Sequence, residues 1–498
     1  MTMNARALMV QGTASFAGKS VLVTGLCRLL VRRGFRVAPF KAQNMSLNSG
    51  ATPDGREIGR AQMVQAEAAR LVPDADMNPV LLKPSGASRC QVVMRGQVWG
   101  DLPGPRSAGF AAEAWAAIRE SYARLASAFE VVVIEGAGSP AEINCLDRDL
   151  SNMRVAHLAD APVLLVADMD RGGAFASLYG TWALLPAADR RRIRGFVFNK
   201  LRGEPQGLAP GLSRLERETG VPTLGFLPWL PDLSLDEEDG VALDARPPKA
   251  DRPGRVRVVV IRFPTIANFT DFAPLEQDPA FAVGYATDSE ALAAADVLIL
   301  PGSKHTAADL VWMRDRRLDQ AVRDRVAAGA RLIGICGGFQ MLGRRVADPD
   351  GMEGAIRETP GLGLLDVETR MGRTKTVWPV TADPLPGTPL TGLTGLAGYE
   401  IHLGISRVGP GSRPLLQVRR PDGSTVMDGA ASPDGGVWGT SLHGLFEHAG
   451  LRARLAGAEI ETRPADSALS REAQYDRLAD ALEIHLDVAR VLTLVGIE

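Results

Sequence analysis

Residues 331–342 constrain the fold of this chain more than any other segment. Their first half is a short apolar run, which predicts a buried strand. Gly334, Cys336 and Gly338 then form a Gly-x-Cys-x-Gly turn, and a helical pattern follows. This order predicts a nucleophile elbow, in which glycines permit a sharp turn and a thiol replaces the usual serine hydroxyl. The N-terminus of the following helix favours the thiolate form of Cys336, because it carries partial positive charge.

A thiolate nucleophile requires a general base, and the chain contains only six histidines. His443 lies in the run Ser-Leu-His-Gly-Leu-Phe at residues 441–446. Together with the elbow, this run resembles the class I, triad-type glutamine amidotransferases. The resemblance implies Cys336 as nucleophile and His443 as base. It leaves open which group orients His443, since many of these domains carry Glu two residues later and this chain has Leu445; Glu447 is close in sequence.

A second loop of the same domain carries the expected oxyanion hole. A predicted strand at residues 296–300 ends in Pro-Gly-Ser-Lys-His-Thr. In the amidotransferase family this loop lies against the nucleophile. The resemblance therefore implies Gly302 or Ser303, together with Gly337, as backbone N–H donors to the oxyanion. His305 in this loop is the alternative base, but the family's base matches His443.

The N-terminal half begins with a predicted strand at residues 7–10, a glycine-rich loop ending in Gly-Lys-Ser, and a helical run at residues 21–33. This is the P-loop arrangement and predicts ATP binding, with backbone N–H groups around the phosphates. Lys19 would reach the β- and γ-phosphates, and the Ser20 hydroxyl would hold Mg²⁺.

The spacing of this loop differs from the standard motif. Five residues separate Gly12 from Gly18, where the standard motif has four, and Thr13 occupies the usual first-glycine position. The spacing matches the variant loop of dethiobiotin synthetase-like ATPases.

Further apolar runs alternate with helical patterns and predict a doubly wound, mostly parallel α/β sheet. The predicted strands lie at residues 35–40, 131–134, 162–167, 193–198 and 223–228. Polar strings follow several of them, at the carboxyl ends where such sheets bind ligands. Glu135 stands at one of these ends beside the P-loop, so we expect it to join Ser20 in holding Mg²⁺, and Asp168 stands at another.

Three of these polar strings resemble the cobyric acid synthase family: Lys-Ala-Gln-Asn-Met-Ser-Leu-Asn-Ser from residue 41, Glu-Gly-Ala-Gly-Ser-Pro-Ala-Glu-Ile-Asn from residue 135 and Asp-Met-Asp-Arg-Gly-Gly-Ala-Phe-Ala from residue 168. The resemblance implies that Asn199 reads the adenine base and that Lys41 approaches the phosphates or the reacting carboxylate. It also implies that Asp168 and Glu135 lie near the metal and the acyl phosphate, so that Asp168 joins the Mg²⁺ site. It implies ATP- and glutamine-dependent amidation of the b, d, e and g carboxylates of adenosylcobyrinic acid a,c-diamide, in which ammonia attacks an acyl phosphate.

Two other functions remain as alternatives. One is the sister enzyme, cobyrinic acid a,c-diamide synthase, although the strings from residues 41 and 168 favour cobyric acid synthase. The other is a P-loop switch ATPase of the partitioning type, with an amidotransferase-like domain that only binds. Intact Cys336 and His443 favour an enzyme, a glutamine-hydrolysing carbon–nitrogen ligase.

Length and charge patterning predict the domain organisation. With 498 residues, the chain is too long for one core. Residues 234–254 are acidic and then rich in proline and basic residues, which predicts a linker. It would join a P-loop domain at residues 1–233 to an amidotransferase domain at residues 255–450, with a helical extension at residues 451–498.

Composition predicts the partners and location of the chain. A formal net charge of −2 gives no electrostatic case for binding nucleic acid or an anionic membrane. No segment approaches the ~18 consecutive apolar residues of a membrane-spanning helix. The four cysteines are scattered, which fits free thiols in a reducing cytoplasm, so we expect a cytoplasmic protein.

Overall fold

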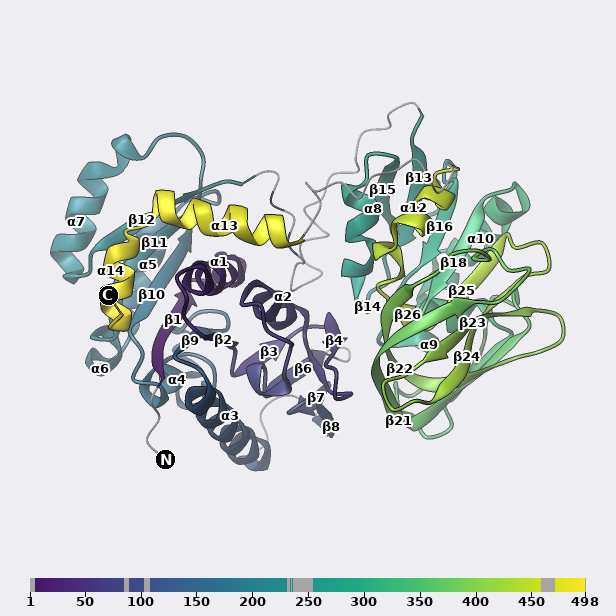
Figure 1. The fold of residues 1–498 in the computed structure, drawn as a ribbon, viewed down its shortest axis with the longest axis horizontal. Coiled ribbons are helices and arrows are strands. Elements are labelled where there is room, and N and C mark those ends of the chain that lie inside the picture. Colours follow the sequence, from purple (N-terminus) through teal and green to yellow (C-terminus); the bar gives the residue numbers. More distant parts are fainter. Residues whose placement is uncertain are drawn as a thin grey trace.

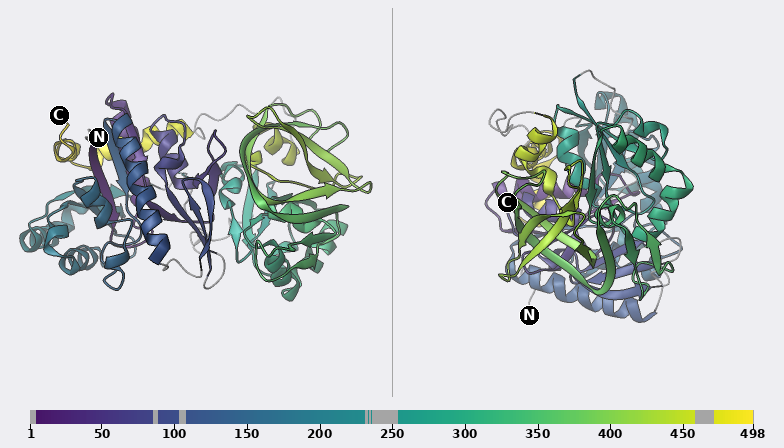
Figure 2. Two further views of the ribbon diagram at one scale, coloured as in Figure 1. Left: turned by 90° about the horizontal axis from the view of Figure 1, so that it is seen from below. Right: turned by 90° about the vertical axis from the view of Figure 1, so that its right-hand side faces the viewer.

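The structure, a computed structural model, describes residues 5–84, 89–102, 108–230, 233, 235, 254–457 and 471–497. Two α/β units lie side by side (Figures 1 and 2). Apart from Leu235 and Gly254, the predicted linker at residues 234–254 lies outside the described residues. None of the helices in the described part of the chain has the length and apolarity needed to cross a membrane.

The first unit contains a parallel six-stranded sheet, which confirms the predicted doubly wound fold. Its order is β12 (Thr223–Pro228), β11 (Ile193–Leu201), β10 (Val163–Asp168), β1 (Arg6–Gly12), β9 (Val131–Glu135) and β2 (Val37–Phe40). Side chains alternate between two cores: Leu8 and Val10 face one, and Ala7 and Met9 face the other. Helix α1 (Lys19–Arg32) covers the first face and α3 (Ala108–Ala128) the second.

A small subdomain is inserted between β2 and α3. It contains helix α2 (Arg60–Ala68) and a four-stranded sheet of β3 (Gln43–Met45), β6 (Val80–Pro84), β7 (Cys90–Met94) and β8 (Gln97–Leu102). A hairpin of β4 (Ser49–Ala51) and β5 (Glu57–Gly59) completes it. Figure 1 shows this insertion on the side of the first unit that faces the second unit.

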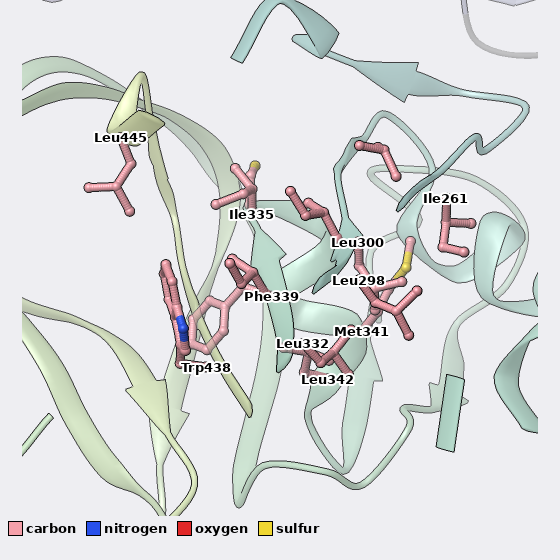
Figure 3. Close-up of a cluster of buried hydrophobic side chains, with 14 of the residues drawn as sticks. Ile261, Leu298, Leu300, Leu332, Ile335, Phe339, Met341, Leu342, Trp438 and Leu445 are labelled. Atoms are coloured by element: carbon pink, nitrogen blue, oxygen red, sulfur yellow. The ribbon is translucent and has the colours of Figure 1, made fainter. Parts of the chain in front are cut away.

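The second unit has a parallel half and an antiparallel half. The parallel strands are β15 (Phe281–Ala286), β13 (Val256–Ile261), β16 (Val297–Leu300), β18 (Arg331–Ile335) and β25 (Val437–Thr440). The sheet continues through β24 (Thr425–Ala431) and β23 (Arg413–Arg419) to the long β21 (Val367–Pro384), which pairs with β22 (Leu396–Val408). Figure 3 shows Leu300, Leu332 and Phe339 in the core around β18.

The C-terminal helices return to the first unit, although they follow the second unit in sequence (Figure 1). Helices α13 (Arg471–His485) and α14 (Val488–Val495) share a core with α1 and β1. Arg28 of α1 is buried and forms two hydrogen bonds to the Asp476 carboxylate, at 2.8 and 2.9 Å. Of the helical extension predicted at residues 451–498, these two helices therefore complete the P-loop unit.

Candidate active sites

The Cys336 thiol stands at the turn between β18 and α11 (Gly337–Leu342). Cys336 has φ 51° and ψ −110°, a strained conformation for a residue with a side chain. A Cβ atom on Gly338 would lie 1.9 Å from the Leu300 carbonyl oxygen, so only glycine fits there. The strand, turn and helix predicted for residues 331–342 are therefore present, and Cys336 Sγ lies 3.6 Å from the Ile401 carbonyl oxygen.

His443 is held on two sides. It lies on the short strand β26 (Leu442–His443) and is buried. Its Nδ1 lies 2.6 Å from Oδ2 of Asp271, and the Asp271 Oδ1 accepts a hydrogen bond from the Gly444 N–H at 3.0 Å. The Tyr399 ring stacks on the imidazole at 5.2 Å and 18°. Asp271 thus occupies the position of the third member of a catalytic triad.

The electrostatics of this cluster favour a charged pair. Burial would raise the pKa of the Cys336 thiol, but the charge and hydrogen bond of His443 outweigh it and bring the pKa below its usual value. Burial would lower the pKa of His443, but the charges of Asp271 and of the Cys336 thiolate raise it well above its usual value. Thiolate and imidazolium therefore stabilise each other, as nucleophilic attack by sulfur requires.

The backbone groups expected at the oxyanion hole gather beside Cys336. Strand β17 (Gly302–Ser303) pairs with β14 (Ile266–Ala267), which places the loop against the nucleophile. A Cβ atom on Gly337 would lie 2.8 Å from the Ser303 backbone nitrogen, so the backbone of Ser303 packs directly against Gly337. These residues share one pocket, lined by Lys83, Ala267, Asn268, Gly302, Ser303, Lys304, Cys336, Gly337, Gln340, Glu353, Lys375, Ile401, His402, Leu403 and His443.

The sequence pattern does not predict Asp271 as a site residue. It lies 172 residues before His443, so no local spacing connects the two. One signal was available: Asp271 follows β13, and polar residues after parallel strands gather at one edge of a sheet. Glu447 instead contacts Arg471 of α13, and His305 stands at the start of α9 (Thr306–Asp315), outside the residues that line the pocket.

The second candidate site lies around the P-loop. Lys19 Nζ donates to the carbonyl oxygens of Ala14 and Gly138, at 3.0 and 3.2 Å. Its ammonium therefore points into the loop where phosphates would bind. Gly12 allows this approach, because a Cβ atom there would lie 3.0 Å from Lys19 Nζ. The Thr13 N–H donates to the Val166 carbonyl at 2.9 Å, which attaches the loop to β10.

Glu135 is the centre of a buried polar cluster beside the P-loop. Its Oε1 accepts hydrogen bonds from Ser20 Oγ at 2.8 Å and Lys41 Nζ at 2.9 Å, and its Oε2 accepts one from Gln65 Nε2 at 2.5 Å. Burial would raise the pKa of Glu135, but the Lys41 charge outweighs it and lowers the pKa. Glu135 is therefore a carboxylate in the interior of the protein.

The two remaining residues expected to bind ATP or Mg²⁺, Asn199 and Asp168, make contacts of their own beside the P-loop and on β10. Asn199 Nδ2 donates to the Ala17 carbonyl at 2.9 Å, and the side chain lies so close to Gly18 that a Cβ atom there would be 1.8 Å from Asn199 Nδ2. Asn199 therefore supports the P-loop directly. Asp168 forms an ion pair with Lys200 at 2.8 Å. Of the three residues expected to hold Mg²⁺, Ser20 and Glu135 are hydrogen-bonded to each other.

The oxygen atoms around Glu135 suit a magnesium ion. Hydroxyl, carboxylate and amide oxygens are the donors that Mg²⁺ prefers in proteins. Ser20 and Glu135 supply the first two. Gln65 Oε1 is buried and has no hydrogen-bond partner within the described residues, so an amide oxygen is available as well.

Comparison with known proteins assigns both units. The model of the CobQ/CobB/MinD/ParA nucleotide binding domain matches residues 8–243, and that of the CobB/CobQ-like glutamine amidotransferase domain matches residues 257–450. The cobyric acid synthase of Sorangium cellulosum is 48% identical, with full coverage of both chains. That of Desulforudis audaxviator is 48% identical over 99% of this chain and all of the relative, and that of Photorhabdus laumondii is 46% identical over 97% of each.

The chain joins a P-loop unit to an amidotransferase unit. In the amidotransferase unit, His443 contacts both Asp271 and the Cys336 thiol. Together these features define a two-domain glutamine amidotransferase. The sequence identity of the relatives, which extends over nearly the whole of both chains, specifies the family more narrowly than the fold does. The chain belongs to the cobyric acid synthase family.

Proposed function

We propose that this chain amidates the b, d, e and g carboxylates of adenosylcobyrinic acid a,c-diamide, with glutamine as nitrogen donor and ATP as energy source. The chain is an amidating ligase of cobalamin biosynthesis. The observation that carries the proposal is the Cys336–His443–Asp271 cluster in the same chain as a P-loop whose Lys19 ammonium donates to the Ala14 carbonyl of the loop.

Glutamine hydrolysis would begin at Cys336. The thiolate attacks the side-chain amide carbon of glutamine, and the carbonyl oxygen becomes an oxyanion stabilised by N–H groups of Gly302 or Ser303 and of Gly337. The imidazolium of His443 donates its Nε2 proton to the departing ammonia, which leaves a thioester on Cys336. His443 then removes a proton from water, and the hydroxide releases glutamate and restores the thiolate.

The glutamine pocket also carries charges that match an amino acid. Lys304 and Lys375 line it together with Glu353 and the catalytic residues. An ammonium side chain attracts the α-carboxylate of glutamine, and a carboxylate attracts its α-ammonium group. Lys83 comes from the first unit, so both units contribute to the wall of the pocket.

Amide synthesis would take place beside the P-loop. A carboxylate oxygen of the corrinoid attacks the γ-phosphorus of ATP, and the bond from this phosphorus to the β,γ-bridging oxygen breaks. ADP departs, and the corrinoid carboxylate becomes an acyl phosphate. Lys19 offsets the negative charge that develops on the phosphoryl oxygens. When bound by Ser20 and Glu135, Mg²⁺ would neutralise phosphate charge at the same place. Ammonia then attacks the acyl carbon, and inorganic phosphate leaves.

The two alternative functions are less well supported. The relatives quoted above are named cobyric acid synthase, which favours that activity over the a,c-diamide synthase. A switch ATPase with a purely binding second domain would not need a thiol whose pKa is lowered by a buried histidine.

The experiment that tests the proposal separates the two nitrogen sources. Replacement of Cys336 by alanine should abolish amidation with glutamine and retain amidation with added ammonia, because the P-loop site is unchanged. Cys90→Ala is the matched control, since burial raises the pKa of this thiol to about 11 and keeps it unreactive. Loss of both activities in a folded Cys336→Ala variant would contradict separate sites for the two reactions.

A further inference from the structure

The two units meet at the segment that carries Asp271. The Ser49 backbone N–H, from the first unit, donates to Oδ1 of Asn268 at 2.9 Å. The Phe269 N–H donates in return to Oδ1 of Asn48 at 3.2 Å. All four of these contacting residues are buried. The end of the polar string from residue 41 is therefore attached to the 3₁₀ helix Phe269–Phe272, which holds the partner of the catalytic histidine.

The other end of the Asn268 side chain reaches the histidine itself. Asn268 Nδ2 lies 3.3 Å from Nε2 of His443. The orientation of the carboxamide follows from its contact with Ser49: a backbone N–H can only donate, so the oxygen faces Ser49 and the NH₂ group faces His443. Since Asp271 occupies Nδ1, Nε2 is the nitrogen that exchanges a proton with Cys336.

An NH₂ group directed at Nε2 has an electrostatic consequence. It can donate a hydrogen bond to the neutral imidazole, but it opposes the Nε2–H of an imidazolium, because two donors then face each other. Asn268 therefore acts against the charged Cys336–His443 pair that Asp271 favours. Among the described residues, the Tyr399 ring stacks on the imidazole, and the titratable residues Lys83, Lys304, Glu353, Lys375 and His402 line the same pocket.

We propose that Asn268 is a positioning residue that restrains His443, and that the P-loop unit controls this restraint through Asn48 and Ser49. The proposal rests on the glutamine hydrolysis assigned above to Cys336 and His443. The string from residue 41 begins at Lys41, which contacts Glu135 beside the P-loop, and ends at Ser49. A shift of this string when ATP or the corrinoid binds would withdraw the NH₂ group from Nε2, so glutamine would be hydrolysed when an acceptor is ready.

Asn268→Gly is the variant that tests this inference. Asn268 has φ 52° and ψ 40°, a left-handed conformation that glycine adopts without strain. The variant removes the carboxamide and leaves Asp271 and Cys336 in place. Two quantities are measured: the apparent pKa of Cys336, from the pH dependence of its alkylation by iodoacetamide followed on the Cys336 peptide, and the rate of glutamine hydrolysis without ATP or corrinoid.

We expect the apparent pKa of Cys336 to fall and the acceptor-independent hydrolysis to rise by about three- to tenfold, the effect of about one hydrogen bond. Asn48→Ala, on the other unit, should shift both quantities in the same direction. The matched control is Gln91→Ala, which removes a different hydrogen bond between the units, from Lys304 Nζ at 2.9 Å, and should leave the pKa of Cys336 unchanged.

Three outcomes would overturn the inference: an unchanged or higher pKa of Cys336 in Asn268→Gly, a lower rate of hydrolysis in that variant, or an equal shift in Gln91→Ala. Failure of the proposed function has a different signature. In that case the wild-type chain would not hydrolyse glutamine under any condition, whereas the alkylation measurement would still report the pKa of Cys336 in every variant.

Discussion

Asp271 is the residue on which the state of His443 depends most directly. It is buried, and its two carboxylate oxygens accept hydrogen bonds from the imidazole and from the Gly444 N–H. The contact fixes the ring orientation and makes Nε2 the nitrogen that exchanges protons with the thiol. The reactive form, thiolate with imidazolium, exists at pH values above the pKa of Cys336 and below that of His443.

Replacement of Asp271 by asparagine should reduce glutamine-dependent amidation by roughly 10²- to 10⁴-fold, as in other triads that lose this carboxylate. Amidation with added ammonia should be retained. Asp271 raises the pKa of His443, so loss of the Asp271 charge should lower this pKa. The alkaline limb of the pH–rate profile for glutamine hydrolysis should therefore move to lower pH. Kinetics with both nitrogen sources check this. Glu447→Gln is the control, and a comparable loss there would contradict the assignment.

The buried pair of Lys41 and Glu135 makes a separate prediction about stability. Lys41→Met should lower the free energy of unfolding by about 3–5 kcal/mol, because it leaves a buried carboxylate without its cation. Urea denaturation measures this change. In the wild type the fold depresses the pKa of Glu135, so the stabilisation is present above the carboxyl's unfolded pKa and is lost as pH falls.

The deficit of Lys41→Met should accordingly become smaller in acid. The double variant Lys41→Met/Glu135→Gln should recover much of the stability, since no unpaired charge remains. A double variant as unstable as the single one would show that the two side chains do not act as a pair.

Helix α13 packs against α1 and completes one core of the P-loop unit. It packs so closely on α1 that a Cβ atom on Gly25 would lie 2.6 Å from a methyl group of Leu482. The ion pair of Arg28 with Asp476 fixes the helix at the same face. Helix α1 begins at Lys19 of the P-loop, so the packing of α13 on α1 stabilises the helix that carries the P-loop lysine.

Leu482→Ala should destabilise the P-loop unit by about 2–5 kcal/mol, because it opens a cavity between α13 and α1. Thermal unfolding followed by calorimetry measures the shift. Ile484→Ala on the same helix is the matched control, since Ile484 is 75% exposed and its loss creates no cavity. Equal effects of the two substitutions would contradict the docking of α13 on α1.

Elements differ in how well the sequence predicts them. All six strands of the first sheet could be predicted, because each contains an apolar run, and β1, β9, β10 and β2 are buried along almost their whole length. Strands β3 and β4 could not, since they have three residues each, with Asn, Gln, Ser and Gly, and only their neighbours in space make them strands. The helical pattern of α13 was visible, but its contact with Arg28 spans 448 residues and leaves no local pattern.

The whole molecule brings the two chemistries together across one interface. Glu57 of the first unit forms ion pairs with its own Lys83 at 2.6 Å and with Lys375 of the second unit at 2.5 Å. Two of these side chains, Lys83 and Lys375, line the pocket of Cys336. The sequence could name the nucleophile and the P-loop because each is a local motif. It could not name this interface, because contacts between units are set by the assembled fold.

The most direct test of the proposed amidation is mass spectrometry of adenosylcobyrinic acid a,c-diamide incubated with the protein, ATP, Mg²⁺ and glutamine labelled in its amide nitrogen. We expect a stepwise series of four amidations that ends at adenosylcobyric acid, with every new amide carrying the label. An unchanged corrinoid, while glutamine is hydrolysed and the protein is folded, would contradict the proposed acceptor.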